Sequence, residues 1–205
     1  MYDIPGAFVL GFLIGLTGAL APGPTLIATI NAALRGGWSA GPRVTLGHIV
    51  VEAGMVVLIC AGLAAVIGTY TSLIAGVGGT ALVVFGLLTV RESRSASIPE
   101  GSGHDAAAHP FIAGVMTSVS NPYFWIWWFS IGSALLIGAL GGGWPVAAAF
   151  LFGHWTADLG WLTLVSASIH RGRFFLGQHG YRLTLAVCGI FLMTFGGYYL
   201  STLLP

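Results

Sequence analysis

Long apolar stretches separated by short polar connections run along the whole chain. About 20 consecutive apolar residues are needed for a helix to cross a bilayer. Stretches of this kind lie near residues 5–31, 41–67, 72–90, 110–139, 145–168 and 181–203. Because backbone polar groups in lipid must be satisfied within their own segment, these stretches predict helices rather than open strands. The pattern therefore predicts an all-α membrane protein with six transmembrane helices.

Composition supports lipid as the solvent of this chain. Hydrophobic residues make up 56% of the sequence and charged residues 6%, whereas a soluble domain carries about 25% charged residues. The net charge of +1 offers no basic face, which argues against nucleic-acid binding. Cys60 and Cys188 each lie inside an apolar run, and we expect both to be inert.

The positive charges predict an orientation. The chain has no lysine, and every arginine falls beside the first, third or fifth connection between helices. Those connections lie on one face, which the positive-inside rule assigns to the cytoplasm. Both termini are then expected outside, with residues 91–109 as a polar cytoplasmic linker between the halves 1–90 and 110–205. These arginines are Arg35, Arg43, Arg91, Arg94, Arg171, Arg173 and Arg182.

An internal match relates the two halves at a constant offset of 106 residues, for example from Gly36 to Gly142. A repeat of this kind fixes the architecture. Each half holds an odd number of predicted helices, so the second copy should be inverted relative to the first, a plan common among secondary transporters. The first copy reads Gly36-Gly37-Trp38, Gly47-His48, Glu52, Gly54, and the second reads Gly142-Gly143-Trp144, Gly153-His154, Asp158, Gly160.

Prolines interrupt the first and fourth predicted helices at corresponding places. Pro22-Gly23-Pro24 lies in the first and Asn121-Pro122-Tyr123 in the fourth. An interior proline removes a backbone hydrogen bond, which costs about 3 kcal/mol. Paired breaks at membrane depth point to a binding site. We therefore expect both helices to be broken and these residues to flank the site.

Ionisable residues inside the predicted helices form two pairs with i, i+4 spacing, His48/Glu52 and His154/Asp158. That spacing places each histidine and its acid on one helical face, and the internal match should turn the two faces toward each other. Three interpretations remain open: a hydrogen-bonded lock between helices, a proton-coupled solute site, or a ligand set for a divalent transition metal.

The aromatic run that starts at Tyr123 is expected to serve packing or lipid contact for the most part. Tyr123 or Trp125 is the candidate for holding a cationic solute by cation–π attraction. Weaker candidates for the wall of a cavity are Thr25, Asn31, Ser118 and Ser120.

Several motifs resemble the LysE/RhtB family of amino-acid exporters over nearly the whole chain. These are Gly15 through Pro22-Gly23-Pro24, then Arg35-Gly36-Gly37 and Gly41, then Phe111, Gly114 and Asn121-Pro122. The resemblance implies efflux of amino acids or related small metabolites, driven by ion gradients, across a prokaryotic plasma membrane. It also implies that the residues flanking Pro22, Gly23, Pro24, Asn121 and Pro122 line the translocation site. Two departures leave the substrate open, since Tyr123 stands where the family often has lysine and the His–acid pairs are not its general pattern.

We therefore expect a secondary transporter that works by alternating access coupled to protons. The alternative is a divalent transition-metal transporter that uses His48, Glu52, His154 and Asp158 as ligands. Neither a Gly-x-Ser-x-Gly element in a helix nor a His-Glu-x-x-His motif is present, so an intramembrane protease is not expected. No cofactor is expected, and a metal would enter only as substrate. The expected partners are the bilayer and a small-molecule or ion substrate, and a homo-oligomer remains open.

Overall fold

The computed structural model describes residues 3–20, 23–62, 71–95 and 109–203 of the chain. Over these residues the protein is helical, with no strand. Three helices are long and apolar enough to cross a membrane, Ala40–Cys60, Pro122–Leu140 and Gly177–Ser201, and a bent pair near the N-terminus makes a fourth candidate. Large apolar side chains such as Val57 stay exposed, as lipid contact requires. The protein is therefore a multi-pass helical membrane protein.

The first predicted stretch is divided into two helices. α1 covers Ile4–Leu20 and α2 covers Pro24–Gly36, and their axes differ by 74°. Pro24 occupies the first turn of α2, where its missing N–H removes no helical bond, and Gly23 precedes it in an extended conformation. Pro22 lies outside the described residues. The break therefore falls where the sequence predicted it, but α2 continues to Gly36, beyond the expected end near residue 31.

The fourth predicted stretch is divided further. α5 (Pro110–Val119) ends before Asn121, whose side chain accepts a hydrogen bond from the Tyr123 backbone at 3.1 Å and so caps α6 (Pro122–Trp127). A π-helical segment, η3 (Trp128–Gly132), then leads into α7 (Ser133–Leu140). The sequence did not predict this π segment. A Cβ on Gly132 would lie 2.8 Å from both the Trp127 and the Trp128 ring, so the glycine lets the two indoles pack over the turn.

The remaining helices are α3 (Ala40–Cys60), α4 (Thr71–Ser93) and α8 (Trp144–Ser201). α3 ends at Cys60, earlier than the expected 67, and residues 63–70 lie outside the described part of the chain. α8 contains the expected fifth and sixth helices, which meet at a kink at Gly177, and its last part, Gly177–Ser201, is itself long and apolar enough to cross a membrane. Both helices extend further than expected, because residues 169–180 are helical apart from Gly177. Arginine is a good helix former and no proline interrupts this stretch, so polar residues extend the helix past its apolar part.

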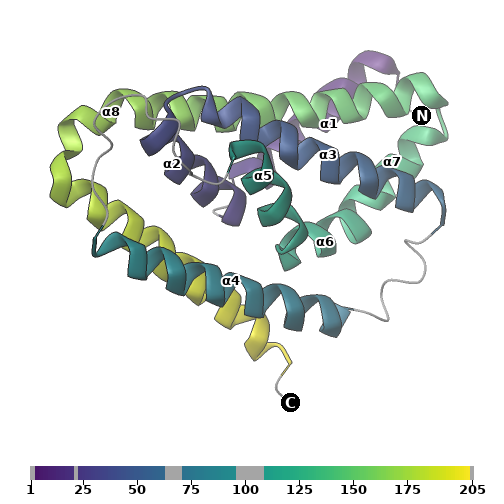
Figure 1. Ribbon diagram of the computed structural model, residues 1–205. Coiled ribbons are helices and arrows are strands. Elements are labelled where there is room, and N and C mark those ends of the chain that lie inside the picture. Colours follow the sequence, from purple (N-terminus) through teal and green to yellow (C-terminus); the bar gives the residue numbers. More distant parts are fainter. Residues whose placement is uncertain (1–2, 21–22, 63–70, 96–108, 204–205) are drawn as a thin grey trace.

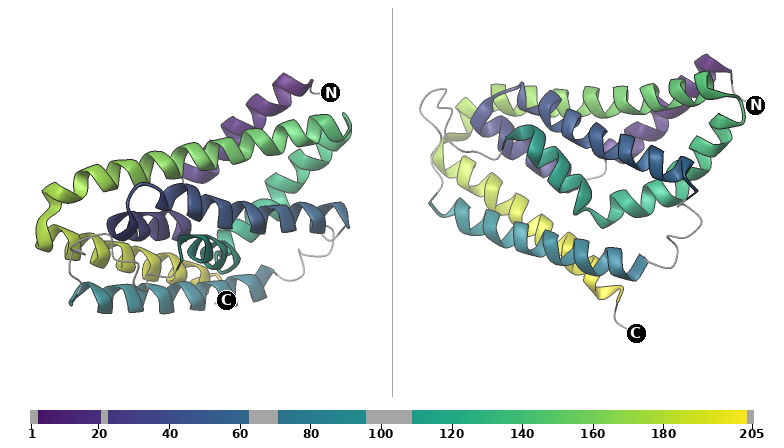
Figure 2. Two further views of the ribbon diagram at one scale, coloured as in Figure 1. Left: turned by 45° about the horizontal axis from the view of Figure 1, so that its top comes forward. Right: turned by 45° about the vertical axis from the view of Figure 1, so that its right-hand side comes forward.

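α8 runs along one side of the molecule, turns back at Gly177 (φ 58°) and returns beside α4 (Figure 1). The two further views show the same antiparallel arrangement of α4 and the end of α8 (Figure 2). Glycines allow this close approach. A Cβ on Gly86 would meet the Gly189 carbonyl at 2.5 Å, and one on Gly196 would meet the Gly79 carbonyl at 2.6 Å.

Two other helix pairs approach backbone to backbone in the same manner. α1 packs against the first part of α8, and α5 packs against α3. In both pairs a side chain at the crossing glycines would collide with the carbonyl of the facing helix. The contacts correspond across the two halves: Gly153 meets Phe8 as Gly47 meets Phe111, and Gly11 meets Phe150 as Gly114 meets Val44.

Candidate functional site

A cavity of about 360 Å³ lies where the broken helices meet α3 and α8. Gly18 and Ala19 at the end of α1 and Thr25 and Leu26 at the start of α2 form one side. Pro24 and Pro122 are buried beside the cavity but do not line it, because each begins a helix and packs into the protein. Of the predicted site residues, those that line the cavity are Gly23, His48, Glu52, Asn121, Tyr123, His154 and Asp158.

Glu52 of α3 is the centre of the polar network. Its side chain is 1% exposed, and its Oε1 atom has three nitrogen neighbours from three elements. Trp128 donates its indole N–H at 3.1 Å, His154 Nε2 lies at 3.0 Å and His48 Nε2 at 3.2 Å. A carboxylate buried in the membrane is costly unless it is paired. These neighbours supply the pairing and hold α3, η3 and α8 together.

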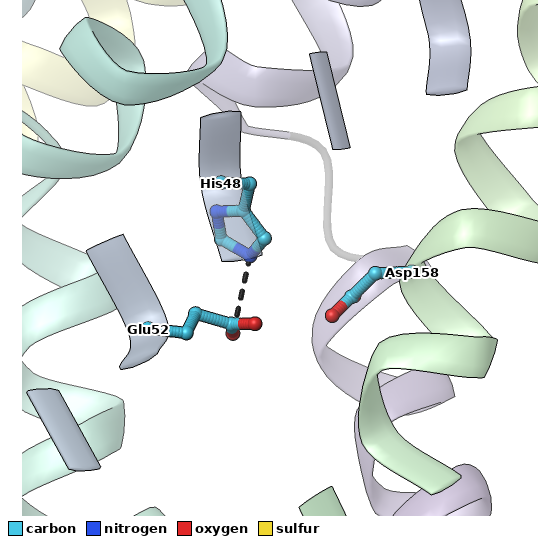
Figure 3. Close-up of side chains that lie close together, drawn as sticks. All are labelled: His48, Glu52 and Asp158. Atoms are coloured by element: carbon cyan, nitrogen blue, oxygen red, sulfur yellow. Dashed lines mark ion pairs between the residues drawn. The ribbon is translucent and has the colours of Figure 1, made fainter. Parts of the chain in front are cut away.

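Asp158 faces Glu52 from the opposite helix (Figure 3). Its Oδ2 atom lies 3.4 Å from His154 Nε2, one turn earlier on α8. Among the described residues, neither Asp158 Oδ2 nor Glu52 Oε2 has a hydrogen-bond partner, although both atoms are buried. Buried polar atoms are normally satisfied, so Glu52 Oε2 can bind a cation or an ammonium group in the cavity, and Asp158 Oδ2 can do so beside its ion pair with His154.

His48 has partners on both ring nitrogens. Ser118 lies 2.6 Å from His48 Nδ1 and donates its hydroxyl hydrogen to the Gly114 carbonyl at 2.7 Å. A hydroxyl has one hydrogen to donate, so Nδ1 must donate to Ser118. The other nitrogen, Nε2, faces Glu52, and two lone pairs would repel there. One proton therefore lies between His48 and Glu52, on either the imidazole or the carboxyl.

His154 is less completely bonded than His48. Its Nδ1 atom is buried and has no hydrogen-bond partner among the described residues. Gly15 of α1 packs directly against this nitrogen, since a Cβ at Gly15 would lie 2.9 Å from it. Position 15 therefore has no room for a side chain that could bond His154 Nδ1. The two histidines, which correspond in the internal match, thus differ in environment. Nε2 is the nitrogen through which His154 interacts with both acids.

Aromatic rings enclose this polar centre. Phe124 contacts the His48 ring edge-on, with centroids 5.5 Å apart. Trp127 and Trp128 lie 5.2 Å and 5.4 Å from the His154 ring. Trp125, which the sequence suggested as a cavity residue, does not line the cavity and donates to the Val119 carbonyl at 2.7 Å instead. The rings that line the cavity, Phe124, Trp127 and Trp128, have i, i+3, i+4 spacing and so share one helical face.

Sequence reasoning missed several cavity residues. Trp127, Trp128, Leu162, Phe191 and Phe195 all line the cavity, yet each belongs to an apolar stretch that looks like any other membrane helix. Of the weaker candidates, Thr25 also lines the cavity. Ser118 does not line it but contacts His48, which does. Asn31 and Ser120 are not among the lining residues.

The start of α2 brings a second kind of polar group to the cavity. The first N–H groups of a helix have no acceptor within the helix and carry partial positive charge. Gly23, Thr25 and Leu26 line the cavity at this end, and no side chain caps it. The cavity therefore has the N-terminal end of α2 on one side and, among the described residues, two carboxylate oxygens without a hydrogen bond on another.

A metal ion is also chemically compatible with part of the network. His48, Glu52 and Asp158 each present a ligand atom, and these atoms lie within 4.8 Å of one another. Imidazole and carboxylate together suit divalent transition metals. Two carboxylates would compensate the charge of such an ion.

Comparisons with known proteins agree with this architecture. The family model described as LysE type translocator matches residues 16–202. A curated relative from Pseudomonas aeruginosa, the chemotactic transduction protein ChpE, is 27% identical over 195 residues, covering 93% of this chain and 95% of the relative. No solved structure matches the chain. With buried ionisable residues around a cavity between broken helices, the chain belongs to the LysE-type translocator family and is a membrane transporter.

Proposed function

We propose that this protein is a secondary transporter that exports amino acids or related small metabolites across a prokaryotic plasma membrane. It works by alternating access and is coupled to the proton gradient. The observation that carries this proposal is the pairing of opposite polar groups in one cavity. The N-terminal end of α2 lines the cavity at Thr25 and Leu26, while Glu52 and Asp158 each present an oxygen that makes no hydrogen bond within the described part of the chain.

This pairing complements a zwitterion. In transporters with broken helices, half-helix N-termini bind the anionic group of the substrate. The α2 end would therefore take a substrate carboxylate, and the two acids would take its ammonium group. Asn121 and Tyr123, at the second break, line the same cavity and add polar contacts from the other half of the chain.

Alternating access follows from two inverted halves that rock around the shared site. The first helix of each half packs on the second helix of the other, through glycine contacts that correspond between α1 with α8 and α5 with α3. This correspondence supports two related halves around a shared site. The arginine distribution supports termini outside and the linker 91–109 in the cytoplasm. In this arrangement the two His–acid pairs approach the membrane midplane from opposite halves of the chain. These pairs are His48 with Glu52 and His154 with Asp158.

Proton coupling has its basis in the proton shared by His48 and Glu52. A substrate ammonium that binds the carboxylates competes for the same negative charge as that proton. Loading the substrate from one side and the proton from the other would then be mutually exclusive, which is the requirement for exchange of the two.

The test uses purified protein in proteoliposomes with an imposed pH gradient. We expect concentrative movement of a labelled amino acid that collapses when the gradient is dissipated. Glu52→Gln should abolish the response to the gradient, because an amide cannot take up the proton. Asp3→Asn is the matched control, since Asp3 lies at the exposed start of α1 and only caps Gly6. Equal loss in both variants, or no movement of any amino acid, would contradict the proposal.

Transport of a divalent transition metal is the second candidate. The clustering of His48, Glu52 and Asp158 favours it specifically. After chelation and re-addition of Zn²⁺ or Mn²⁺, the bound metal is measured per protein. A stoichiometric metal that is lost in both His48→Ala and His154→Ala would support this candidate against the amino-acid proposal. Absence of bound metal, together with pH-dependent amino-acid counterflow that Glu52→Gln abolishes, would exclude it.

A further inference from the structure

The apolar wall of the cavity carries information on the substrate beyond its two charged groups. The second part of α8 contributes Phe191 and Phe195 to the cavity lining, and Leu26 and Leu162 add further apolar side chains. The two phenyl rings are stacked, with centroids 5.9 Å apart and an angle of 16° between their planes. Both rings line the cavity, and we call the pair the aromatic surface.

Neighbouring side chains fix the position of this aromatic surface. Phe191 and Phe195 pack against a core of Ile27, Leu82 and Leu192, which joins α2, α4 and α8. The Phe195 ring also contacts Tyr199 edge-on at 5.2 Å. Rings fixed by their neighbours lose little further freedom when a solute binds, so the surface is preorganised to receive an apolar group.

The charges of the cavity allow one ammonium group rather than two. Glu52 Oε1 already has three nitrogen neighbours. Ligand atoms of His48, Glu52 and Asp158 lie within 4.8 Å of one another, so the two acids are close enough to bind a single cation together. Among the described residues that line the cavity, Glu52 and Asp158 are the acidic ones. A second ammonium, as on a lysine side chain, would be buried without a carboxylate of its own, which is costly.

We propose that the transported solute is an amino acid with an aromatic or large apolar side chain, which lies against Phe191 and Phe195. This inference rests on the proposed amino-acid transport and specifies its substrate class. The cavity volume of about 360 Å³ is near the lower end of the range of about 300–1,000 Å³ found for small-molecule sites. That volume suits one such amino acid, with its carboxylate at α2, its ammonium at Glu52 and Asp158, and its side chain on the aromatic surface.

The experiment measures counterflow in proteoliposomes loaded with labelled phenylalanine, with competition by leucine, alanine, lysine and phenylethylamine. We expect leucine to compete well, alanine weakly, and lysine and phenylethylamine poorly. Phe195→Ala should raise the half-saturating concentration of phenylalanine about tenfold, which corresponds to about 1.4 kcal/mol, and leave that of alanine unchanged. Phe152→Ala is the matched control, because Phe152 lies on α8 with 60% of its surface exposed.

Each other outcome has a definite meaning. Transport of lysine or alanine with an affinity equal to that of phenylalanine would overturn this inference and leave amino-acid transport standing. Equal competition by phenylethylamine would also overturn it, since the carboxylate would then take no part in recognition. If no amino acid moves, both proposals fail together. Should Phe195→Ala not fold, Phe195→Leu keeps the apolar volume without the ring, and an unchanged preference for phenylalanine over leucine would count against the aromatic surface.

Discussion

Glu52 Oε1 and His154 Nε2 lie 3.0 Å apart, although the two residues are separated by 102 positions and come from different halves of the chain. Each is also one turn from its own helical neighbour, His48 for Glu52 and Asp158 for His154. The contact converts two local pairs into one network across the cavity. Both side chains are almost fully buried, so the network must be nearly complete to be tolerated in the membrane.

The Glu52–His154 contact should be measurable as a coupling energy. Residues in direct contact show interaction energies of about 0.5–3 kcal/mol in double-mutant cycles. We expect Glu52→Gln and His154→Asn to be non-additive in thermal unfolding of the detergent-solubilised protein. The control cycle combines Glu52→Gln with Asp3→Asn. Asp3 is exposed at the start of α1, so the effects of these two substitutions on stability should be additive. Additivity in both cycles would show that the two side chains do not interact.

Gly47 and Gly54 of α3 should respond in opposite ways to replacement by alanine. A Cβ on Gly47 would collide with the Phe111 carbonyl of α5, whereas nothing lies within 4 Å of one on Gly54. Overpacking typically costs about 1–3 kcal/mol, while alanine in an open helical position gains roughly 0.5–1 kcal/mol over glycine. The melting temperature should therefore fall in Gly47→Ala and be unchanged or higher in Gly54→Ala. A melting temperature for Gly47→Ala at or above that of the wild type would argue against the α3–α5 crossing.

Gly177 should be required where α8 turns back. Its backbone, with φ 58° and ψ 176°, lies in a region that is essentially limited to glycine, where another residue costs about 1–3 kcal/mol. Gly177→Ala should lower the melting temperature. Gly172→Ala is the control, because Gly172 is helical and nothing would lie within 4 Å of a Cβ placed there. If the two variants melt alike, Gly177 is not the site of the turn.

Ser118→Ala should destabilise the protein by leaving His48 Nδ1 without an acceptor. An unsatisfied buried donor costs about 1–3 kcal/mol. Ser120 provides the comparison, since its hydroxyl bonds the Met116 carbonyl on its own helix and is more exposed, and Ser120→Ala should be nearly neutral. Chemical denaturation in detergent gives both values. A Ser118→Ala variant as stable as Ser120→Ala would show that the hydroxyl does not support His48.

Much of the site could be predicted from the sequence because it depends on local spacing. The i, i+4 geometry of His48 with Glu52 follows from the pitch of one helix, and Asn121 before Pro122 marks a helix start by local chemistry alone. The match between the halves also indicated that the second pair would approach the first. Trp128 was not recognised, because it stands in a continuous aromatic run, and only its hydrogen bond to Glu52 on a distant helix distinguishes it from neighbouring rings.

The sequence by itself determined that this chain is a helical membrane protein, where its helices break and which ionisable residues its membrane segments carry. Hydrophobicity, proline and helical pitch are properties of neighbouring residues, so they can be read along the chain. Only the tertiary structure decided that Glu52 has nitrogen neighbours from three elements, that Asp158 faces it from another helix and that Phe191 and Phe195 line the cavity. Those relationships depend on glycine crossings between distant helices, where the absence of a side chain sets how closely two backbones approach.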